Sequence, residues 1–284
     1  MKLVKIGMLF DMLRVEEKML MREARSQGTE LDLIRVCSKP FELWQCQANN
    51  SEIFLQRCVS YFRGLHSTGV LEMGGNRVVN SLVSTLICGD KAFATMALAS
   101  KGIPTPKTAI AFSKESAMLA LNELGYPAVL KPVVGSWGRF LAPLNDAESA
   151  QAMFETRQYM HPLYQIYYIQ ERVKRPPRDA RVLVVGGVPI AASYRYAPAS
   201  DWRTNAAIGG RSEPYQLTKE IEDLSVQAAA ATGAEIAGVD FMESENGPLV
   251  HEVNARTEFK GLVAATGVNV PGAILDYLRK IYSR

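Results

Sequence analysis

The sequence predicts a fold of mixed α/β and α+β class that begins with an open α/β domain, and three observations support this prediction. Apolar runs alternate with helix-like stretches before residue 90, as in a small α/β domain. Short apolar runs separated by glycine turns dominate after residue 180, as in antiparallel hairpins. A Gly/Pro break at 102–107 separates the two regions. The 284 residues therefore suffice for two or three small domains.

The first region opens on an apolar run, 3–10, that we expect to be a buried strand. A signal peptide is not favoured, because the run lacks a small-residue cleavage site and leads into charged residues. A helix is predicted at 14–27, since Val15 and Met19 share one helical face and Gly28 follows. The rest of the region is expected to form strands at 31–36 and 52–59 and helices near 63–72 and 81–102.

The remaining elements follow from the same patterns. The middle of the chain is predicted to form helix, strand, loop, strand, helix and strand at 112–125, 128–133, 135–138, 139–144, 145–158 and 167–173. Gly186-Gly187 between two apolar runs predicts a hairpin. We expect a helix at 218–232, strands at 235–242 and 249–254 around a turn near Gly247, and a final helix at 270–282.

Composition narrows the classes of function. The net charge of +3, from 32 basic and 29 acidic residues, is too small to favour nucleic acid as a partner. No apolar run reaches the roughly 18 residues that a membrane span needs. The cysteines, Cys37, Cys46, Cys58 and Cys88, contain no C-x-x-C pair, which argues against zinc and for reduced, inert thiols. We therefore expect a cytoplasmic protein.

A lysine and two glycines mark the segment VLKPVVGSWGR, residues 129–139. Lys131 leaves a predicted strand, and its charge suits phosphate oxygens. Gly135 and Gly138 follow, and glycines let backbone N–H groups close over phosphates. The segment matches neither the Walker nor the dinucleotide-binding pattern. Taken alone, it would more often be a glycine hairpin with a surface lysine.

Two predicted strands near the C-terminus bring oxygen-bearing side chains together. Glu252 and Asn254 are two residues apart, so both should project from one face, while His251 and Val253 face the other way. Asp240 is expected on the neighbouring strand. Carboxylate and amide oxygens suit Mg²⁺, which usually takes its other ligands from phosphate and water. The alternative is an edge hairpin with solvated acids.

Two further groups are weaker by themselves. The apolar strand YYIQERV ends at Gln170-Glu171 and Val173, where a carboxylate and exposed backbone could hold an adenine edge; a strand leaving the core is the alternative. Arginine suits bidentate binding of carboxylate or phosphate, and a solvated face is the alternative for such residues. The second group comprises Arg181, Arg195, Arg203 and Arg211, with Asn205 and Gly209-Gly210 among them.

In this order, these segments resemble the ATP-grasp ligases, and the resemblance covers almost the whole chain. The order of the motifs is far more specific than any single motif. The resemblance implies the three-domain ATP-grasp fold, with ATP held between the second and third domains and Mg²⁺ as the metal. We expect an N-terminal α/β domain at 1–90, a central domain at 91–172 and a C-terminal domain at 173–284.

The resemblance also implies roles for individual residues. The residues implied to bind the nucleotide phosphates are Lys91 in ICGDKAFAT, Lys131, and the loop Gly135, Ser136, Trp137, Gly138 and Arg139. Glu171 and Val173 would form the adenine hinge, Asp179 would bind the ribose, and Asn205 would also bind the nucleotide. Arg181 and Asn205 match catalytic groups near the transferred phosphate. The magnesium ligands would be Asp240, Glu252 and Asn254.

Within these ligases, the stretches GSWGR, DWRTN and NARTEFK are most similar to the LysX/ArgX family. Its members join the α-amino group of glutamate or 2-aminoadipate to the side-chain carboxylate of the C-terminal glutamate of the carrier protein LysW. Arg195 matches the position that contacts the amino acid, and Arg203 is a second candidate for its carboxylates. Gly261-Leu262 after EFK is closer to the enzymes of arginine biosynthesis, which favours glutamate.

One departure concerns the family pattern T-N-x-A-R-G-G. Ile208 stands where the pattern has arginine, and Arg211 is the candidate to replace it. The implied reaction forms ADP and an acyl phosphate of the carrier, which the amine then attacks. The open alternatives are 2-aminoadipate or both substrates, a RimK-like glutamate ligase acting on another protein or cofactor, and a non-catalytic ATP-sensing subunit. Family members are commonly homodimers or homotetramers, so we expect one of these.

Overall fold

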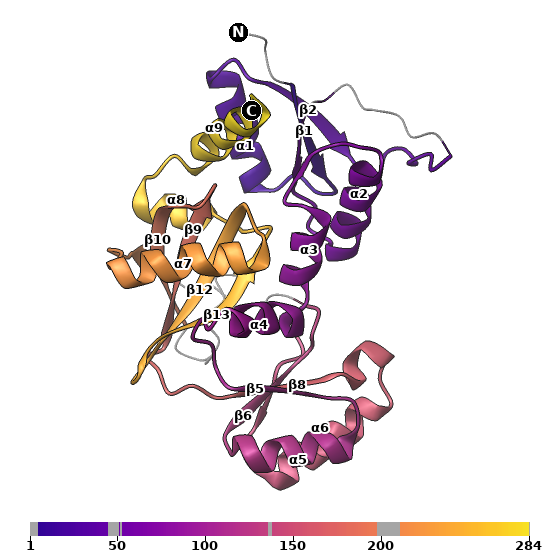
Figure 1. Cartoon of the computed structure of the whole chain (residues 1–284), viewed down its shortest axis with the longest axis vertical. Coiled ribbons are helices and arrows are strands. Elements are labelled where there is room, and N and C mark those ends of the chain that lie inside the picture. The colour runs from indigo at the N-terminus through magenta and orange to yellow at the C-terminus, as the bar shows by residue number, and fades with distance from the viewer. Residues whose placement is uncertain (1–4, 45–50, 52, 136–137, 198–210, 284) are drawn as a thin grey trace.

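The computed structural model describes residues 5–44, 51, 53–135, 138–197 and 211–283. Three β-sheets organise these residues, and each predicted domain range contains one of them. In Figure 1 the N-terminal sheet lies at the top, the C-terminal sheet in the middle and the central sheet at the bottom. Domain boundaries at residues 90 and 172 remain our proposal.

The N-terminal sheet is parallel, with the strand order β2-β1-β3-β4. Its strands are β1 (Lys5–Phe10), β2 (Glu30–Arg35), β3 (Ile53–Gln56) and β4 (Val78–Val79), and the helices of this part include α1 (Val15–Ser26) and α2 (Tyr61–Met73). Met8 and Leu9 of β1 point to opposite faces and both are fully buried, as expected for a parallel sheet covered on both faces. The last helix of the chain, α9 (Val270–Tyr282), returns to pack beside α1 (Figure 1).

The segment predicted as one helix at 81–102 is two helices joined by a sharp bend. α3 spans Leu82–Gly89, α4 spans Lys91–Ser100, and the two helices meet at 102°. Asp90 lies between them, and its carboxylate accepts hydrogen bonds from the backbone N–H groups of Ala92 and Phe93. The prediction of a continuous helix was wrong, because this cap begins a new helix at Asp90. The bend places Lys91 at the first position of α4.

The central sheet is antiparallel, with the order β5-β8-β6-β7. Its elements are β5 (Thr108–Ala111), α5 (Lys114–Leu124), β6 (Ala128–Lys131), β7 (Ala142–Leu144), α6 (Ala147–Gln158), the 3₁₀ helix η1 (Pro162–Gln165) and β8 (Tyr167–Glu171). Leu121 of α5 and Phe154 of α6 are fully buried against Leu130 and Tyr167 of the sheet. Both helices lie on the face turned away from the C-terminal sheet (Figure 1).

The C-terminal sheet is antiparallel, with the order β11-β10-β9-β12-β13. Its elements are β9 (Arg178–Val185), β10 (Val188–Tyr196), β11 (Ser212–Pro214), α7 (Lys219–Thr232), β12 (Ile236–Ser244), β13 (Gly247–Asn254) and α8 (Lys260–Thr266). The predicted hairpin is confirmed: Gly186 and Gly187 have φ angles of 59° and 79°, and Val185 pairs with Val188. The sequence analysis did not predict α8.

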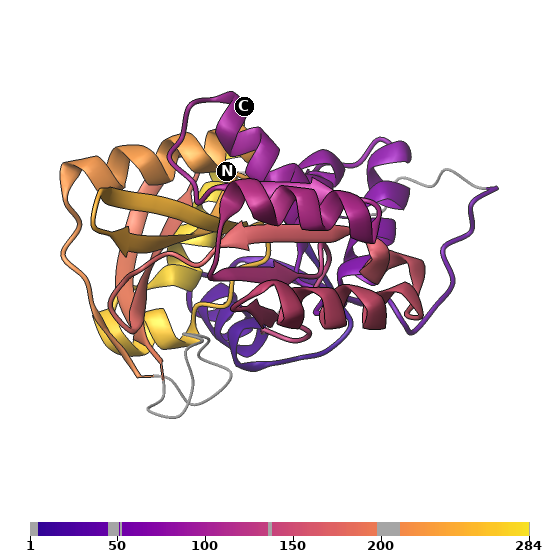
Figure 2. The same cartoon turned by 90° about the horizontal axis from the view of Figure 1, so that it is seen from below.

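The N-terminal and C-terminal sheets share one hydrophobic core, whereas the central sheet has its own. Met8 of β1 packs in a cluster that includes Leu183 of β9 and Ile274 of α9. The central part is joined to the rest mainly along the C-terminal sheet (Figures 1 and 2). Among the described residues, no single helix is long and apolar enough to cross a membrane, and two bent helix pairs reach that length only together.

Candidate active site between the central and C-terminal sheets

A cavity of about 590 Å³ lies where the central sheet faces the C-terminal sheet. From the central sheet it is lined by Val129, Lys131 and Gln170, and from the C-terminal sheet by Met242, His251 and Glu252. The loop after β6 and the segment that follows β8 also line it, including Gly135, Arg139, Glu171, Val173 and Arg175. Much of the predicted nucleotide-binding set therefore meets around one cavity.

Lys131, the last residue of β6, is the buried cation of this cavity. Its Nζ donates a hydrogen bond to Gln170 Oε1 at 2.5 Å and lies 2.7 Å from His251 Nε2. Burial and the nearby ammonium of Lys91 lower the pKa of Lys131 to about 7. Burial, and then Lys131 itself, lower the pKa of His251 well below its ordinary value. Near neutral pH a neutral imidazole can thus accept a hydrogen bond from the lysine.

Binding of a non-hydrolysable ATP analogue at about pH 8 is expected to take up close to one proton. Above its pKa of about 7, Lys131 is mostly neutral in the free protein, and a phosphate beside it would raise that pKa. At about pH 6 the lysine is already protonated, so the uptake should fall toward zero. Affinity should accordingly weaken as the pH rises. Calorimetry in buffers of different ionisation enthalpy measures the uptake, and an equal uptake by Lys131→Met would contradict this origin.

A β-bulge changes which side chains of β13 face the cavity. Asp240 of β12 pairs with Glu252, but the next residue, Phe241, pairs with Val250. His251 is therefore an extra residue on β13, and such bulges redirect side chains. Strict alternation predicted that His251 faces away from Glu252. That expectation was wrong, because both residues line the cavity.

Asp240 is buried at the centre of a cluster of charges. Arg181 Nε and Nη2 donate to its Oδ1 and Oδ2 at 2.7 and 2.8 Å, and Arg195 Nη2 lies 2.9 Å from Oδ2. Asn254 Nδ2 donates to the same oxygen at 3.4 Å. Although burial opposes ionisation, the two guanidinium groups lower the pKa of Asp240 to about 2. The carboxylate is therefore charged at neutral pH and held in a fixed orientation.

Asp179 and Arg195 lie behind the cavity rather than in it. Arg195 Nε donates to Asp179 Oδ1 at 2.6 Å, and both side chains are more than nine-tenths buried. Burial disfavours the charge on Arg195, but Asp240 and Asp179 raise its pKa above the ordinary value. Neither residue lines the cavity. The geometry therefore does not support ribose binding by Asp179 or direct substrate binding by Arg195. Both residues belong instead to the buried charge cluster around Asp240.

A smaller cavity of about 160 Å³ adjoins the first, and Lys91, Gly135 and Glu252 line both. Lys91 Nζ donates to the carbonyl oxygen of Gly135 at 2.6 Å and lies 3.9 Å from Glu252 Oε1. Asn254 and Arg256 also line the smaller cavity, as do residues of the N-terminal part. An anionic group at the boundary would contact the lysine, and a molecule in the smaller cavity would lie beside that group.

The described residues of the predicted adenine hinge and glycine loop line the large cavity. Glu171 and Val173 line the large cavity, and Glu171 Oε1 accepts a hydrogen bond from the backbone N–H of Lys107 at 2.8 Å. Gly138 and Arg139 line it as well. The predicted site residues Ser136, Trp137, Arg203 and Asn205, and the departure at Ile208, lie outside the described residues. Arg211 is exposed and pairs with Glu213.

Gly261 and Leu262, proposed to contact substrate, line neither cavity. Leu262 is 4% exposed and packs in the core shared by the N-terminal and C-terminal sheets. A Cβ atom on Gly261 would lie 3.2 Å from Ser212 Oγ, so β11 crowds this position. The geometry thus gives both residues a place in the packing and does not support direct contact with substrate.

Sequence reasoning missed three further residues that line the large cavity: Gln170, Arg175 and His251. Gln170 is a fully buried polar residue inside an apolar strand, and this contrast could have marked it. Arg175 has a largely buried guanidinium whose Nη1 donates to the carbonyl oxygen of Arg178, and burial lowers its pKa. The pattern of the surrounding sequence does not distinguish Arg175 from its basic neighbours.

The oxygen ligands of β13 fit a magnesium ion that is bound mainly through substrate. The described residues contain no group of three or more His, Cys, Asp or Glu side chains placed to hold a metal. Glu252 and Asn254 line the smaller cavity, whereas Asp240 lines neither cavity and both of its carboxylate oxygens are bound by Arg181 and Arg195. Mg²⁺ needs only one or two protein carboxylates when phosphates and water complete its shell. Glu252 and Asn254 therefore fit this metal, and the geometry does not support Asp240 as a direct ligand.

Solved structures with the same architecture define the class of protein. The chain resembles a RimK-domain ATP-grasp protein from Sphaerobacter thermophilus, with a TM-score of 0.79, 23% identity, and 97% of this chain and 99% of that chain covered. It also resembles a D-alanine–D-alanine ligase from Bacillus anthracis, with a TM-score of 0.71, 18% identity and 99% of both chains covered. The fold is therefore the ATP-grasp fold, as the sequence predicted.

Sequence relatives narrow the class to a family. Residues 88–278 match the RimK-like ATP-grasp domain, and residues 6–86 match the LysX preATP-grasp domain. An alpha-aminoadipate–LysW ligase, LysX, from Saccharolobus solfataricus is 36% identical over 93% of this chain and 96% of its own length. A glutamate–LysW ligase, ArgX, from Sulfurisphaera tokodaii is 30% identical over 99% and 100%. The chain belongs to the LysX/ArgX family of ATP-grasp ligases and is an ATP-dependent carbon–nitrogen ligase.

Proposed function

We propose that this enzyme joins the α-amino group of glutamate to the side-chain carboxylate of the C-terminal glutamate of LysW. The main support from the structure is the pair of adjoining cavities that share Lys91, Gly135 and Glu252. A nucleotide in the larger cavity would place its terminal phosphate beside a carboxylate in the smaller one. Relatives that match nearly the whole chain carry names that state LysW as their partner.

The first step transfers the γ-phosphoryl group of ATP to a carboxylate. A carboxylate oxygen attacks the γ-phosphorus, the bond to the β-phosphate oxygen breaks, and ADP leaves with that electron pair. Lys91 and Lys131 would offset the charge that grows on the phosphate oxygens. Arg181 lies behind them, held by Asp240 in a bidentate pair. The backbone between Glu171 and Val173 would hold the adenine edge at the far end of the cavity.

The second step forms the amide bond. The neutral amine of the amino acid attacks the acyl carbon of the acyl phosphate, the bond from that carbon to the phosphate oxygen breaks, and inorganic phosphate leaves with the electron pair and the proton that the amine loses. Water would compete with the amine, so the site must exclude it during this step. We assign this task to the loop after β6, of which Gly135, Gly138 and Arg139 line the cavity.

Magnesium would be held by Glu252 and Asn254, with Asp240 supporting them from the paired strand. When bound, the ion supplies charge that stabilises the phosphates of ATP. Lys131 and Lys91, which lies 3.9 Å from Glu252, would share this task. A solved relative of the same fold, PsnB, was crystallised with Mg and ADP.

The assay that tests this proposal measures ADP release with LysW, Mg-ATP and either amino acid. We expect ADP release to require both LysW and glutamate, and mass spectrometry to show LysW heavier by one glutamyl residue. ADP release without any modification of LysW, in the presence of another glutamate acceptor, would instead support a RimK-like role. ATP binding without turnover under all conditions would support an ATP-sensing subunit.

2-Aminoadipate is the second candidate for the amino acid, and one observation favours it. The alpha-aminoadipate–LysW ligases compared are 34–36% identical to this chain, against 28–30% for the glutamate–LysW ligases. The two amino acids differ by one methylene, which a pocket usually distinguishes by about 1–3 kcal/mol. A competition assay with the two amino acids at equal concentration measures which one is joined to LysW. We expect at least a tenfold preference for glutamate.

A further inference from the structure

The smaller cavity lies where the N-terminal and C-terminal parts of the chain meet. Its lining includes Gln56, Ser60 and Tyr61 from the N-terminal part, and Asn254 and Arg256 from the segment after β12. Lys91, Gly135 and Glu252 form its boundary with the larger cavity. Its volume of about 160 Å³ suits one amino-acid residue rather than a nucleotide. The contents of this cavity would therefore lie directly beside the phosphates of a nucleotide in the larger one.

Arg256 is a partly buried cation in the lining of this cavity. Its Nη1 atom is buried, and among the described residues that atom has no hydrogen-bond partner. Burial, followed by the neighbouring cations Arg57 and Arg14, lowers the pKa of the Arg256 guanidinium to about 10. Leaving a buried donor without an acceptor is costly, so this Nη1 atom points to a ligand that supplies one.

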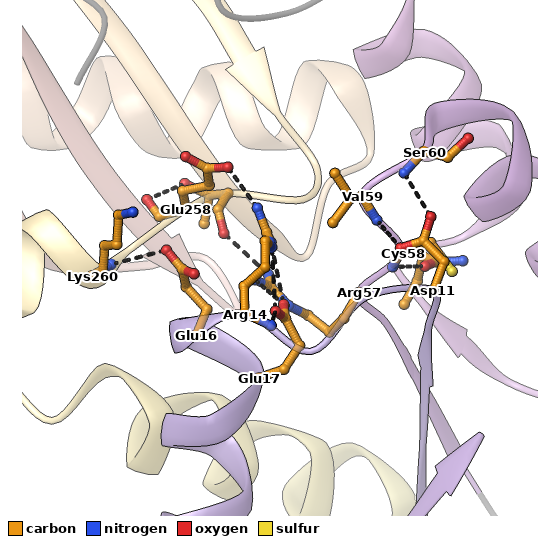
Figure 3. A network of polar contacts seen from close by, with 12 residues as sticks. Asp11, Arg14, Glu16, Glu17, Arg57, Cys58, Val59, Ser60, Glu258 and Lys260 are labelled. Carbon is orange, nitrogen blue, oxygen red and sulfur yellow. Dashed lines mark hydrogen bonds and ion pairs between the residues drawn. The ribbon is translucent and has the colours of Figure 1, made fainter. Parts of the chain in front are cut away.

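Two acidic side chains that stabilise the charge of Arg256 are also bound to other cations. Glu258 Oε1 accepts a hydrogen bond from Arg14 Nη1 at 2.6 Å, and Glu17 Oε1 accepts one from Arg57 Nε at 3.0 Å. Figure 3 shows these four side chains turned toward one another between α1 and the segment before α8. This network joins the two parts of the chain, and Arg256 beside it lines the cavity.

The first turn of α2 adds to the positive potential. α2 begins at Tyr61, with Ser60 as its N-cap, and both residues line the cavity. The N-terminus of a helix carries a partial positive charge that favours anions within its first turn. The Asp11 carboxylate already accepts hydrogen bonds from the backbone N–H groups of Val59 and Ser60 and offsets part of this potential, so Arg256 is the feature that prepares the small cavity for a negatively charged group.

We propose that the smaller cavity binds the terminal glutamyl residue of the carboxylate substrate, with Arg256 pairing with its α-carboxylate. This inference rests on the proposed function, in which the side-chain carboxylate of that residue is the group that reacts. A C-terminal glutamate carries two carboxylates, and only one can receive the phosphoryl group. Arg256 holds the other, because a guanidinium binds a carboxylate through two parallel hydrogen bonds. The reacting carboxylate then points to the boundary, where Lys91 and Glu252 lie.

The test compares two synthetic peptides that end in glutamate, one with a free α-carboxylate and one with a C-terminal amide. Calorimetry with a non-hydrolysable ATP analogue and Mg²⁺ measures their affinities for wild type, Arg256→Met, Arg256→Lys and Arg77→Met. Wild type should bind the free acid at least ~10-fold more tightly than the amide. Arg256→Met should bind both equally, and Arg256→Lys should retain part of the preference.

Arg77→Met is the matched control, because Arg77 is half exposed and pairs with Glu235 at the same interface between the N-terminal and C-terminal parts of the chain. It should keep the full preference for the free acid. The proposal is overturned if Arg256→Met keeps that preference, if wild type binds neither peptide, or if the variant loses affinity for free glutamate alone. A merely structural role would lower the melting temperature of Arg256→Met in the absence of ligand, whereas we expect no decrease.

The outcomes separate this inference from the proposed function. If wild type binds the free-acid peptide through Arg256 but does not modify LysW, the assignment of LysW fails and the cavity assignment stands. If Arg256→Met modifies LysW with an unchanged KM for the carrier, the cavity assignment fails and the proposed function stands.

Discussion

Glu252→Gln is expected to lower the rate of ADP release by roughly 10³-fold while leaving the fold intact. Glu252 lines both cavities, lies 3.9 Å from Lys91 and belongs to the proposed magnesium set. Glutamine keeps the shape but removes the charge. Loss of several kcal/mol of transition-state stabilisation corresponds to a rate decrease of this order. ADP release under saturating ATP, carrier and amino acid measures the effect.

Glu220→Gln supplies the control for this substitution. Glu220 is exposed in the first turn of α7, away from both cavities, so the same chemical change should alter ADP release less than about twofold. The far-UV circular dichroism of both variants should match that of wild type. Turnover of Glu252→Gln within tenfold of wild type would remove Glu252 from the metal set and from the phosphate site.

Asp240→Asn is expected to lower the free energy of unfolding by about 3–5 kcal/mol, the usual cost of removing one partner from a buried ion pair. Asp240 is 2% exposed and is the shared acceptor of Arg181 and Arg195. An asparagine would leave those two buried cations with less compensation. Because the pKa of Asp240 lies near 2, below its ordinary value, the stabilisation should be present at neutral pH and be lost as the pH falls toward 2.

Urea unfolding at neutral pH measures this loss, and Asp223→Asn is the matched control. Asp223 is half exposed on α7 and pairs with Lys219, so its replacement should change the free energy of unfolding by less than about 0.5 kcal/mol. A loss below about 1 kcal/mol in Asp240→Asn would show that the cluster contributes little to stability. The acid limb of the wild-type stability curve offers a second check.

The sequence was sufficient for the regular elements because their signals are local. Apolar periodicity and glycine turns identified most of the strands and the Gly186-Gly187 hairpin, but β4, β5 and β11 were not predicted. The bend at Asp90 was missed, although an aspartate after a glycine is a common helix start, because the apolar spacing continues across it. α8 is short and packs against β10 and β11, and its residue Leu262 is buried in the core shared by the N-terminal and C-terminal sheets, which local patterns cannot show.

Site residues could be predicted where the match to a family motif also places the side chain at the cavity. The prediction was less successful where tertiary packing determines the partner or direction of a side chain. Lys131, Glu171 and Glu252 meet at one cavity as expected. Arg195 pairs with Asp179, and the two residues do not belong to one sequence motif. A residue that was predicted to contact substrate therefore forms an internal ion pair. His251 reaches the cavity through a register shift between β12 and β13, which depends on both strands together.

The central claim is that a nucleotide binds between the central and C-terminal sheets with its phosphates at the boundary of the two cavities. A crystal structure of the protein with Mg²⁺ and a non-hydrolysable ATP analogue tests it most directly. The account predicts the adenine beside Glu171 and Val173, phosphate oxygens within hydrogen-bond distance of Lys91 and Lys131, and the metal on Glu252 and Asn254. A nucleotide bound elsewhere, or phosphates without contact to either lysine, would contradict it.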